Sequence, residues 1–165
     1  MNNNETVKNF NVISWSCQGF FAKYTEFKCL LNEFSPYIIN LQETKYRANF
    51  VPKLNKYNGY YKNVDSQTIS HGGVCSFVHE DIHSIPINLN TDLQAVAFQI
   101  SYPFEHVICN LYLPGSTIVD KQKLVHLINQ LGQKFILVGH FNAHNPPWGS
   151  VKLDNRGKII EEIID

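Results

Sequence analysis

The chain has 165 residues, of which 44% are hydrophobic and 17% charged, which suits one globular core and excludes a disordered segment. Its formal net charge is zero, so bulk attraction to nucleic acid is excluded and any such binding needs a local basic patch. No apolar run approaches the roughly 18 residues of a membrane span, and the first five residues lack the basic start and apolar core of a signal peptide.

The first part of the chain predicts a strand-helix-strand unit. Residues 10–15 are expected to form a strand, and residues 24–34 a helix whose apolar side chains recur at helical spacing. Pro36 should end that helix, and residues 37–42 are expected to form the next strand.

The middle of the chain predicts a meander of strands. Strand-like segments at residues 60–64, 74–78 and 93–100 are separated by Gly, Asn, Asp and Pro residues, which favour turns. We expect these segments to be antiparallel neighbours in a mixed sheet.

A second strand-helix-strand unit follows, with strands at residues 106–113 and 134–139 and a helix near 121–131. A short amphipathic helix is expected at 158–164. Two such units around a meander predict a layered α/β sandwich with helices outside the sheets. Because no linker, repeat or low-complexity tract interrupts the pattern, residues 1–165 are expected to form a single domain.

The loop after the last strand carries a cluster of polar side chains. The apolar run that ends at Gly139 predicts a buried strand, and the carboxyl end of such a strand is where α/β sheets usually place their chemistry. His140, Asn142 and His144 lie there. The Pro-Pro pair downstream argues against a helix, so a zinc site on the two histidines is not expected.

Two of these loop residues, Asn142 and His144, also have a structural interpretation. The Asn142 amide can orient an attacking water or a phosphate oxygen, or it can shape the loop as an Asx turn. His144 can contact a substrate, although a loop hydrogen bond to the backbone is the favoured interpretation.

Two residues upstream are further candidates. Glu43 follows a strand rich in Ile and Leu and can hold a hard cation such as Mg²⁺, or it can be a solvated residue that caps a helix or pairs with Lys45. Tyr112 alternates with Leu111 and Leu113, so its phenol should point to the opposite sheet face, where it can reach a phosphate. A core or edge aromatic residue is the alternative for Tyr112.

Three short strings stand in a fixed order along the chain: Leu41-Gln42-Glu43-Thr44, Asn110-Leu111-Tyr112-Leu113-Pro114 and Gly139-His140-Phe141-Asn142. Together they resemble the endonuclease/exonuclease/phosphatase superfamily, and most closely the endonuclease domain of jockey-like non-LTR retrotransposons. The resemblance implies a DNase I-like sandwich and a Mg²⁺-dependent hydrolase, with Mn²⁺ as a possible substitute, that nicks DNA at target sites.

The resemblance also implies roles for individual residues. Glu43 would be the metal ligand, and Tyr112 and Asn142 would be catalytic residues that steady the phosphate. His140 would take the place of the catalytic aspartate beside the scissile phosphate. Ser16 and His144 would contact the substrate.

Two of these positions depart from the family pattern. The family has Gly-Asp-Phe-Asn where this chain has His140, and it usually has Asn where this chain has Ser16. A neutral imidazole can partly replace a carboxylate as a base but cannot restore its negative charge. A serine hydroxyl lacks the reach and the second functional group of an amide.

The expected activity is therefore weak or absent. The alternatives are a catalytically dead relic, a repurposed nucleic-acid-binding domain and a protein-interaction module. In the family, later strands carry further catalytic residues, so the C-terminal part of the domain is expected to be missing. The expected partners are DNA, through its phosphate backbone, and a reverse transcriptase domain, with no membrane.

The cysteines bear on where the protein resides. Cys17, Cys29, Cys75 and Cys109 form no CxxC pair, and three of them lie within apolar segments, where free thiols commonly pack. A soluble, reduced, intracellular chain is expected, and a nuclear one if it acts on chromosomal DNA.

Overall fold

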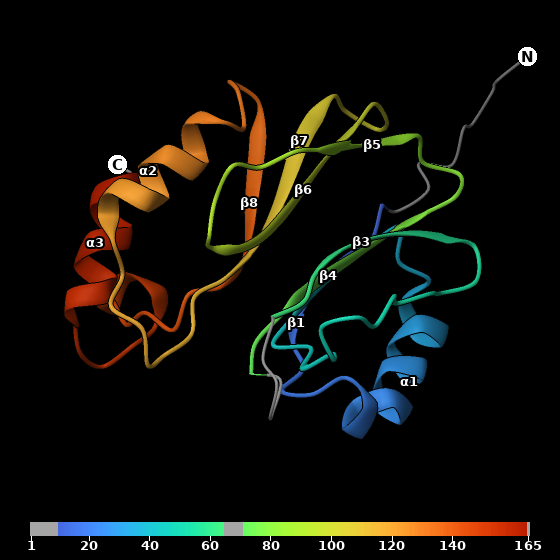
Figure 1. Cartoon of the computed structure of the whole chain (residues 1–165), viewed down its shortest axis with the longest axis horizontal. Helices are drawn as coiled ribbons and strands as arrows, with labels where there is room; N and C mark the ends of the chain where they lie inside the picture. The colour runs from blue at the N-terminus through green and yellow to red at the C-terminus, as the bar shows by residue number, and fades with distance from the viewer. Residues whose placement is uncertain (1–9, 65–70, 165) are drawn as a thin grey trace, which may run out of the picture.

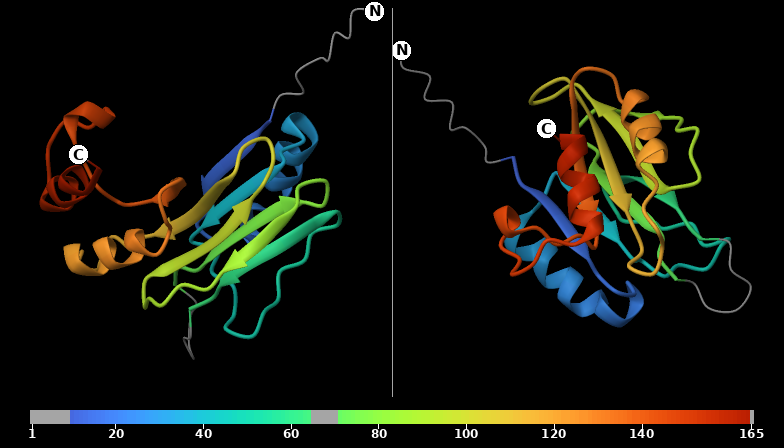
Figure 2. Two further views of the ribbon diagram at one scale, coloured as in Figure 1. Left: turned by 90° about the horizontal axis from the view of Figure 1, so that it is seen from above. Right: turned by 90° about the vertical axis from the view of Figure 1, so that its left-hand side faces the viewer.

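A computed structural model describes residues 10–64 and 71–164 of the chain (Figure 1). Two four-stranded β-sheets pack against each other, and helices cover their outer faces. The helices α1 and α3 lie at opposite margins of the sandwich (Figure 2). The predicted layered α/β sandwich is confirmed, whereas the extent of the single domain stays a prediction.

The first sheet contains the first strand-helix-strand unit. Its strand order is β1-β2-β4-β3, with β1 parallel to β2 and the other pairs antiparallel. The short helix η1 and the helix α1 connect β1 to β2. The elements are β1 (Val12–Ser16), η1 (Phe21–Lys23), α1 (Tyr24–Phe34), β2 (Ile38–Gln42), β3 (Tyr57–Lys62) and β4 (Val74–His79).

The second sheet repeats this arrangement at the end of the chain. Its strand order is β5-β6-β7-β8, with β7 parallel to β8 and the other pairs antiparallel. The helix α2 connects β7 to β8, and η2 and α3 follow. The elements are β5 (Ser84–Ile87), β6 (Gln94–Ile100), β7 (His106–Tyr112), α2 (Lys121–Asn129), β8 (Phe135–His140), η2 (Pro146–Trp148) and α3 (Asn155–Ile164).

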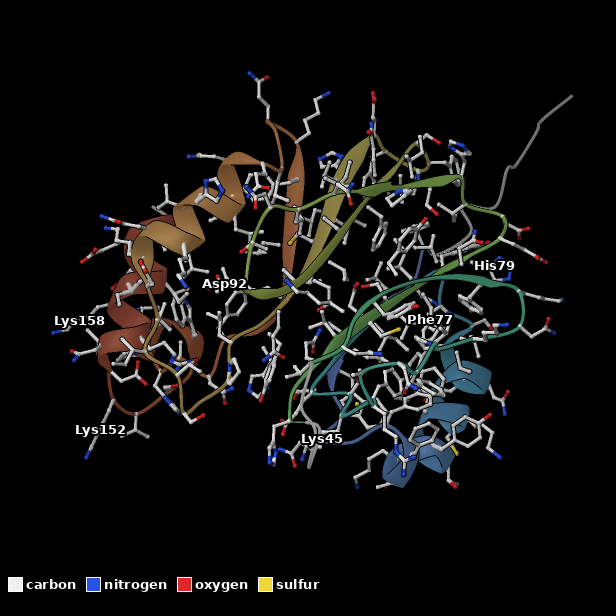
Figure 3. All side chains as sticks on the ribbon, viewed as in Figure 1. Lys45, Phe77, His79, Asp92, Lys152 and Lys158 are labelled. Carbon is white, nitrogen blue, oxygen red and sulfur yellow. The ribbon has the colours of Figure 1, made fainter. Side chains whose placement is uncertain are left out.

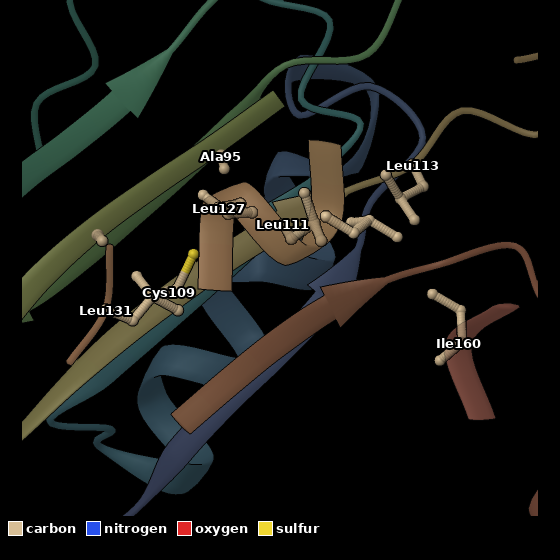
Figure 4. Close-up of a cluster of buried hydrophobic side chains, with 9 residues drawn as sticks. Ala95, Cys109, Leu111, Leu113, Leu127, Leu131 and Ile160 are labelled. Carbon is tan, nitrogen blue, oxygen red and sulfur yellow. The ribbon is translucent and has the colours of Figure 1, made fainter. Parts of the chain in front are cut away.

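Each sheet buries its outer face under a helix. Phe27 of α1 packs on Ile39 and Leu41 in the first sheet. Leu127 of α2 packs on Leu111 in the second sheet, and both are fully buried (Figure 4). Full burial of one such side chain contributes about 1.5–3 kcal/mol. These contacts hold each parallel strand pair in place, and with it the loops at its carboxyl end.

The interface between the sheets changes from apolar to polar along the strands. One end is filled by buried apolar side chains that include Ile38, Phe98 and Ile108. At the other end the fully buried Gln42 and Asn110 join the two sheets, because Gln42 Nε2 donates to Asn110 Oδ1 at 2.7 Å. A buried amide pair is stable only when its hydrogen bonds are made, so this contact fixes how the sheets face each other.

Most predicted elements are confirmed to within a few residues, and one strand was not predicted. The helix α1 has both predicted ends, and α3 begins three residues before the predicted start at 158. The unpredicted strand is β5, which contains Pro86. Proline is tolerated there because β5 is the edge of its sheet.

Two further predictions concern the cysteines and membrane spans. Cys17, Cys75 and Cys109 are buried free thiols, whereas Cys29 is a free thiol on the surface. Among the residues that the structure describes, no helix has the length and apolar character needed to cross a membrane.

Candidate functional site

The candidate residues gather at the carboxyl ends of the two parallel strand pairs, β1 with β2 and β7 with β8. Ser16 ends β1, Glu43 follows β2, Tyr112 ends β7 and His140 ends β8. Lys45, which follows Glu43, marks this end of the molecule in Figure 3. Because β1 contacts β8 and β2 contacts β7 across the sandwich, residues far apart in sequence meet here.

Glu43 lies in a strained loop and is already paired. Its φ is 55° and that of Lys45 is 53°, a left-handed backbone that costs a non-glycine residue about 1–2 kcal/mol. The loop is held by backbone bonds from Thr44 and Lys45 to the carbonyls of Gly73 and Gly72, at 3.2 and 2.8 Å. Lys45 Nζ lies 3.2 Å from Glu43 Oε1. The pairing with Lys45 that the sequence left open is therefore present.

Tyr112 points into the space between the sheets, as predicted. Leu111 and Leu113 pack under α2 on the other face, while the Tyr112 ring is 6% exposed. Burial raises the pKa of the Tyr112 hydroxyl, and the nearby Glu43 carboxylate raises this pKa further. The phenol is therefore a neutral donor beside the carboxylate.

Asn142 lies next to Tyr112 and does not form the Asx turn that was the alternative. Its φ is 49°, and its Nδ2 donates to the carbonyl of Leu113 at 2.9 Å. An interaction with its amide lowers the pKa of Tyr112, a smaller effect than those of burial and Glu43. Asn142 thus ties the loop after β8 to the loop after β7.

His140 and Ser16 are in direct contact. His140 Nδ1 lies 2.7 Å from Ser16 Oγ, and both side chains are partly buried. The two residues end the edge strands of different sheets. The two residues that depart from the family pattern therefore contact each other.

His144 lies outside this group and makes a different contact from the backbone bond that was favoured. Its Nδ1 lies 2.8 Å from Asp154 Oδ2, and its side chain is 65% exposed. Asp154 also caps α3, because its Oδ1 accepts from the backbone N–H of Gly157 at 2.6 Å. That bond, and then the contact with His144, lower the pKa of Asp154 to about 2.

Arg156 was not predicted, and its hydrogen bonds join two loops of the site. Its guanidinium donates to five backbone carbonyls in the two loops that follow β7 and β8. They belong to Leu113, Pro114, Gly115, Thr117 and Phe141. Its acceptors among the described residues are backbone atoms, so the sequence offers no signal for this role beyond the position of Arg156 at the start of an amphipathic helix.

The donor set fits one kind of metal. Within residues 10–64 and 71–164, no three His, Cys, Asp or Glu side chains lie close enough together to hold a metal ion. Glu43 is the carboxylate of the site, with neutral oxygens on Tyr112 and Asn142 beside it. Such a set suits a weakly held Mg²⁺ or Mn²⁺ that keeps most of its waters, and it does not suit a structural zinc site.

Sequence comparison finds retrotransposon proteins. No family model matches the chain. It is 24% identical over 156 residues to the RNA-directed DNA polymerase from mobile element jockey of Drosophila funebris, and 20% identical over 159 residues to the probable RNA-directed DNA polymerase from transposon X-element of Drosophila melanogaster. These matches cover 91% and 93% of this chain but only 17% of each relative.

Structure comparison finds nucleases. The endonuclease domain of TRAS1, a telomere-specific non-LTR retrotransposon, has a TM-score of 0.73 at 14% identity, over 93% of this chain and 70% of that domain. An AP endonuclease from Archaeoglobus fulgidus has a TM-score of 0.61 at 15% identity, over 91% of this chain and 70% of that one. The DNase I-like fold and the resemblance to retrotransposon endonucleases are thereby confirmed.

Proposed function

We propose that this chain, whose fold is that of the endonuclease/exonuclease/phosphatase enzymes, hydrolyses phosphodiester bonds of DNA with a divalent cation, Mg²⁺ or Mn²⁺, and does so weakly. The observation that carries the proposal is the meeting of Glu43, Tyr112 and Asn142 at the ends of the parallel strands. The relatives' names support a reverse transcriptase as the neighbouring domain in a longer protein, and the structural likeness to endonucleases supports DNA as the substrate. The proposed location is intracellular, and nuclear if chromosomal DNA is cut.

Glu43 would hold the cation, which when bound supplies charge to polarise the phosphate and lower the pKa of a bound water. Lys45 pairs with Glu43 in the free protein. If Glu43 held a cation, the Lys45 ammonium would be free to neutralise a phosphate oxygen.

Tyr112 and Asn142 would position the phosphate. The Tyr112 hydroxyl is a neutral phenol, and its raised pKa keeps it so, which lets it donate to a phosphate oxygen without charge repulsion. Asn142 is fixed by the bond from its Nδ2 to the Leu113 carbonyl, which leaves its Oδ1 to orient an attacking water. The substrate contacts predicted for Ser16 and His144 stay predictions, because Ser16 bonds to His140 and His144 to Asp154 in the free protein.

The activity is weak because, among the residues that the structure describes, Glu43 is the single carboxylate of the site. His140 cannot supply the charge of the aspartate found in the family, and general-base assistance is typically worth about 10²- to 10⁴-fold. A DNA-binding domain without hydrolysis is the second candidate, favoured by the ion pair between Lys45 and Glu43, which already neutralises the carboxylate.

Nicking of supercoiled plasmid by the purified chain, in Mg²⁺ and separately in Mn²⁺, tests the proposal. Glu43→Ala should reduce nicking by at least about 10²-fold, since it removes the charge that holds the cation. Glu33→Ala, at an exposed position on α1, is the matched control and should leave nicking unchanged.

Removal of the metal with EDTA should also stop nicking. If the wild-type preparation relaxes plasmid and Glu43→Ala relaxes it equally, the activity belongs to a contaminant and the proposal is wrong. If neither relaxes plasmid, measured binding of a labelled duplex that is insensitive to Mg²⁺ would establish the second candidate.

A further inference from the structure

Ser16 and His140 connect the two sheets at the edge of the sandwich. They end β1 and β8, which are edge strands and contact each other across the interface. Their side chains meet at 2.7 Å between Ser16 Oγ and His140 Nδ1. A hydroxyl can accept from a protonated ring nitrogen or donate to a bare one.

This contact fixes the imidazole. The backbone of His140 is held by its pairing with Tyr112 and by the bond from the Leu113 N–H to the His140 carbonyl at 3.0 Å. The Tyr112 ring stands on one side, with 6.0 Å between ring centroids. Within the described part of the chain, Ser16 is the hydrogen-bond partner of Nδ1 and Nε2 has none. The free nitrogen is therefore Nε2.

We infer that Ser16 is a positioning residue for His140: its oxygen accepts the proton of Nδ1, which leaves the lone pair on Nε2 to act as the base of the site. The inference rests on the proposed function, whose base it names. The hydrogen bond made by one ring nitrogen decides which nitrogen of a neutral histidine carries the proton. As an acceptor, Ser16 would hold the ring as an aspartate or a backbone carbonyl does behind many catalytic histidines, whereas a hydroxyl that donated would leave the proton on Nε2.

The reaction then balances without a second carboxylate. The oxygen of a water molecule forms the new bond to phosphorus while its proton passes to Nε2. The bond between phosphorus and the leaving oxygen breaks, and that oxygen takes a proton from the imidazolium or from solvent. Nδ1 keeps its proton and its bond to Ser16 throughout.

Nitrogen-15 NMR of the histidine rings tests the positioning on the full chain, with neither metal nor DNA present. At neutral pH the ring of His140 should be a single tautomer, with the proton on Nδ1 and a bare Nε2. In Ser16→Ala the two nitrogens should average towards each other, and in Ser16→Thr the wild-type pattern should return. Loss of one ring signal in His140→Gln assigns the resonance.

His144 is the internal control, because Asp154 holds its ring by an independent contact. Its signals should not change in either Ser16 variant, which would show that the fold near the site is intact. The inference is overturned if the His140 shifts are the same in wild type and Ser16→Ala, or if the wild-type proton resides on Nε2.

Kinetics separate positioning from a structural role. Ser16→Ala should lower kcat for nicking by about 10-fold with KM unchanged, and Ser16→Thr should recover most of it. An equal loss in Ser16→Thr would contradict the inference. A fixed His140 ring in a wild-type protein that never nicks DNA would refute the proposed activity alone, because the NMR result does not depend on turnover.

Discussion

At the scale of single residues, three strained backbone positions lie where function is proposed. Glu43, Lys45 and Asn142 are non-glycine residues with left-handed backbone, and all three lie in loops of the candidate site. Each conformation costs about 1–2 kcal/mol, so it persists only when surrounding contacts impose it. The carbonyls of Gly72 and Gly73 hold the loop after β2 through backbone hydrogen bonds, and Arg156 holds the loop after β8.

Replacement of Arg156 should therefore loosen the site and the fold together. Arg156→Ala leaves several carbonyls without their charged donor, and we expect the free energy of unfolding to fall by roughly 2–4 kcal/mol. Arg156→Lys should recover only a minor part, because an ammonium cannot reproduce the planar fork.

Urea denaturation of the variants measures this loss. Lys158→Ala, at an exposed position on the same helix, should change the free energy of unfolding by less than about 0.5 kcal/mol. A loss in Arg156→Ala no larger than that of the Lys158 control would show that the five bonds do not hold the loops.

At the scale of elements, the pairing of β7 with β8 depends on one glycine. A Cβ placed on Gly139 would lie 1.8 Å from the carbonyl oxygen of Leu111, a rigid backbone atom. By contrast, a Cβ placed on Gly132 would meet nothing within 4 Å. Both glycines have positive φ, at 154° and 78°, so an alanine at either position is conformationally strained. Of the two, only at Gly139 does the added Cβ also clash, so a comparison of the two substitutions isolates the cost of that clash.

Gly139→Ala should consequently be far more damaging than Gly132→Ala. We expect the latter to cost about 1–2 kcal/mol, the penalty of a left-handed alanine, and the former to cost more than roughly 3 kcal/mol by separating the strands. Thermal unfolding followed by circular dichroism compares the two variants. Equal midpoints would contradict the close packing of β8 on β7.

The same elements show what the sequence could predict. The helix α1 was predicted with both its ends, because its apolar spacing is regular and Pro36 follows it. The start of α3 was missed, since Gly157 in its first turn disfavours a helix and only the cap by Asp154 offsets this. Strand β5 was missed because Pro86, in its middle, favours the prediction of a turn.

Part of the candidate site could be named from the sequence, but not its connections. The resemblance named Glu43, Tyr112 and Asn142, and the structure brings them together because the strand ends meet at one edge of each sheet. The contact between Ser16 and His140 spans 124 positions and two sheets, and the bonds of Arg156 go to backbone atoms. No local pattern carries such long-range information, which arises only when the sheets pack.

At the scale of the whole molecule, the edge strands β1 and β8 of the two sheets lie on the same side of the sandwich. Within the described residues, no strand pairs with the outer edge of β1 or of β8. A cavity of about 490 Å³ lies beside β8, lined by residues of α2 and α3. Val12 and Ile136 on these edge strands are 44% and 38% exposed.

Open edge strands with exposed β-branched residues favour pairing between molecules. We therefore expect the isolated chain to self-associate as its concentration rises, measured by sedimentation velocity. Ile136→Lys should reduce association, because a charge on the β8 edge opposes pairing in that register. Ile85→Lys is the matched control on the opposite edge strand, β5, where a short strand and Pro86 already block pairing, so it should have no effect. Monomeric behaviour at all concentrations, or equal effects of the two variants, would show that the β8 edge is protected in solution.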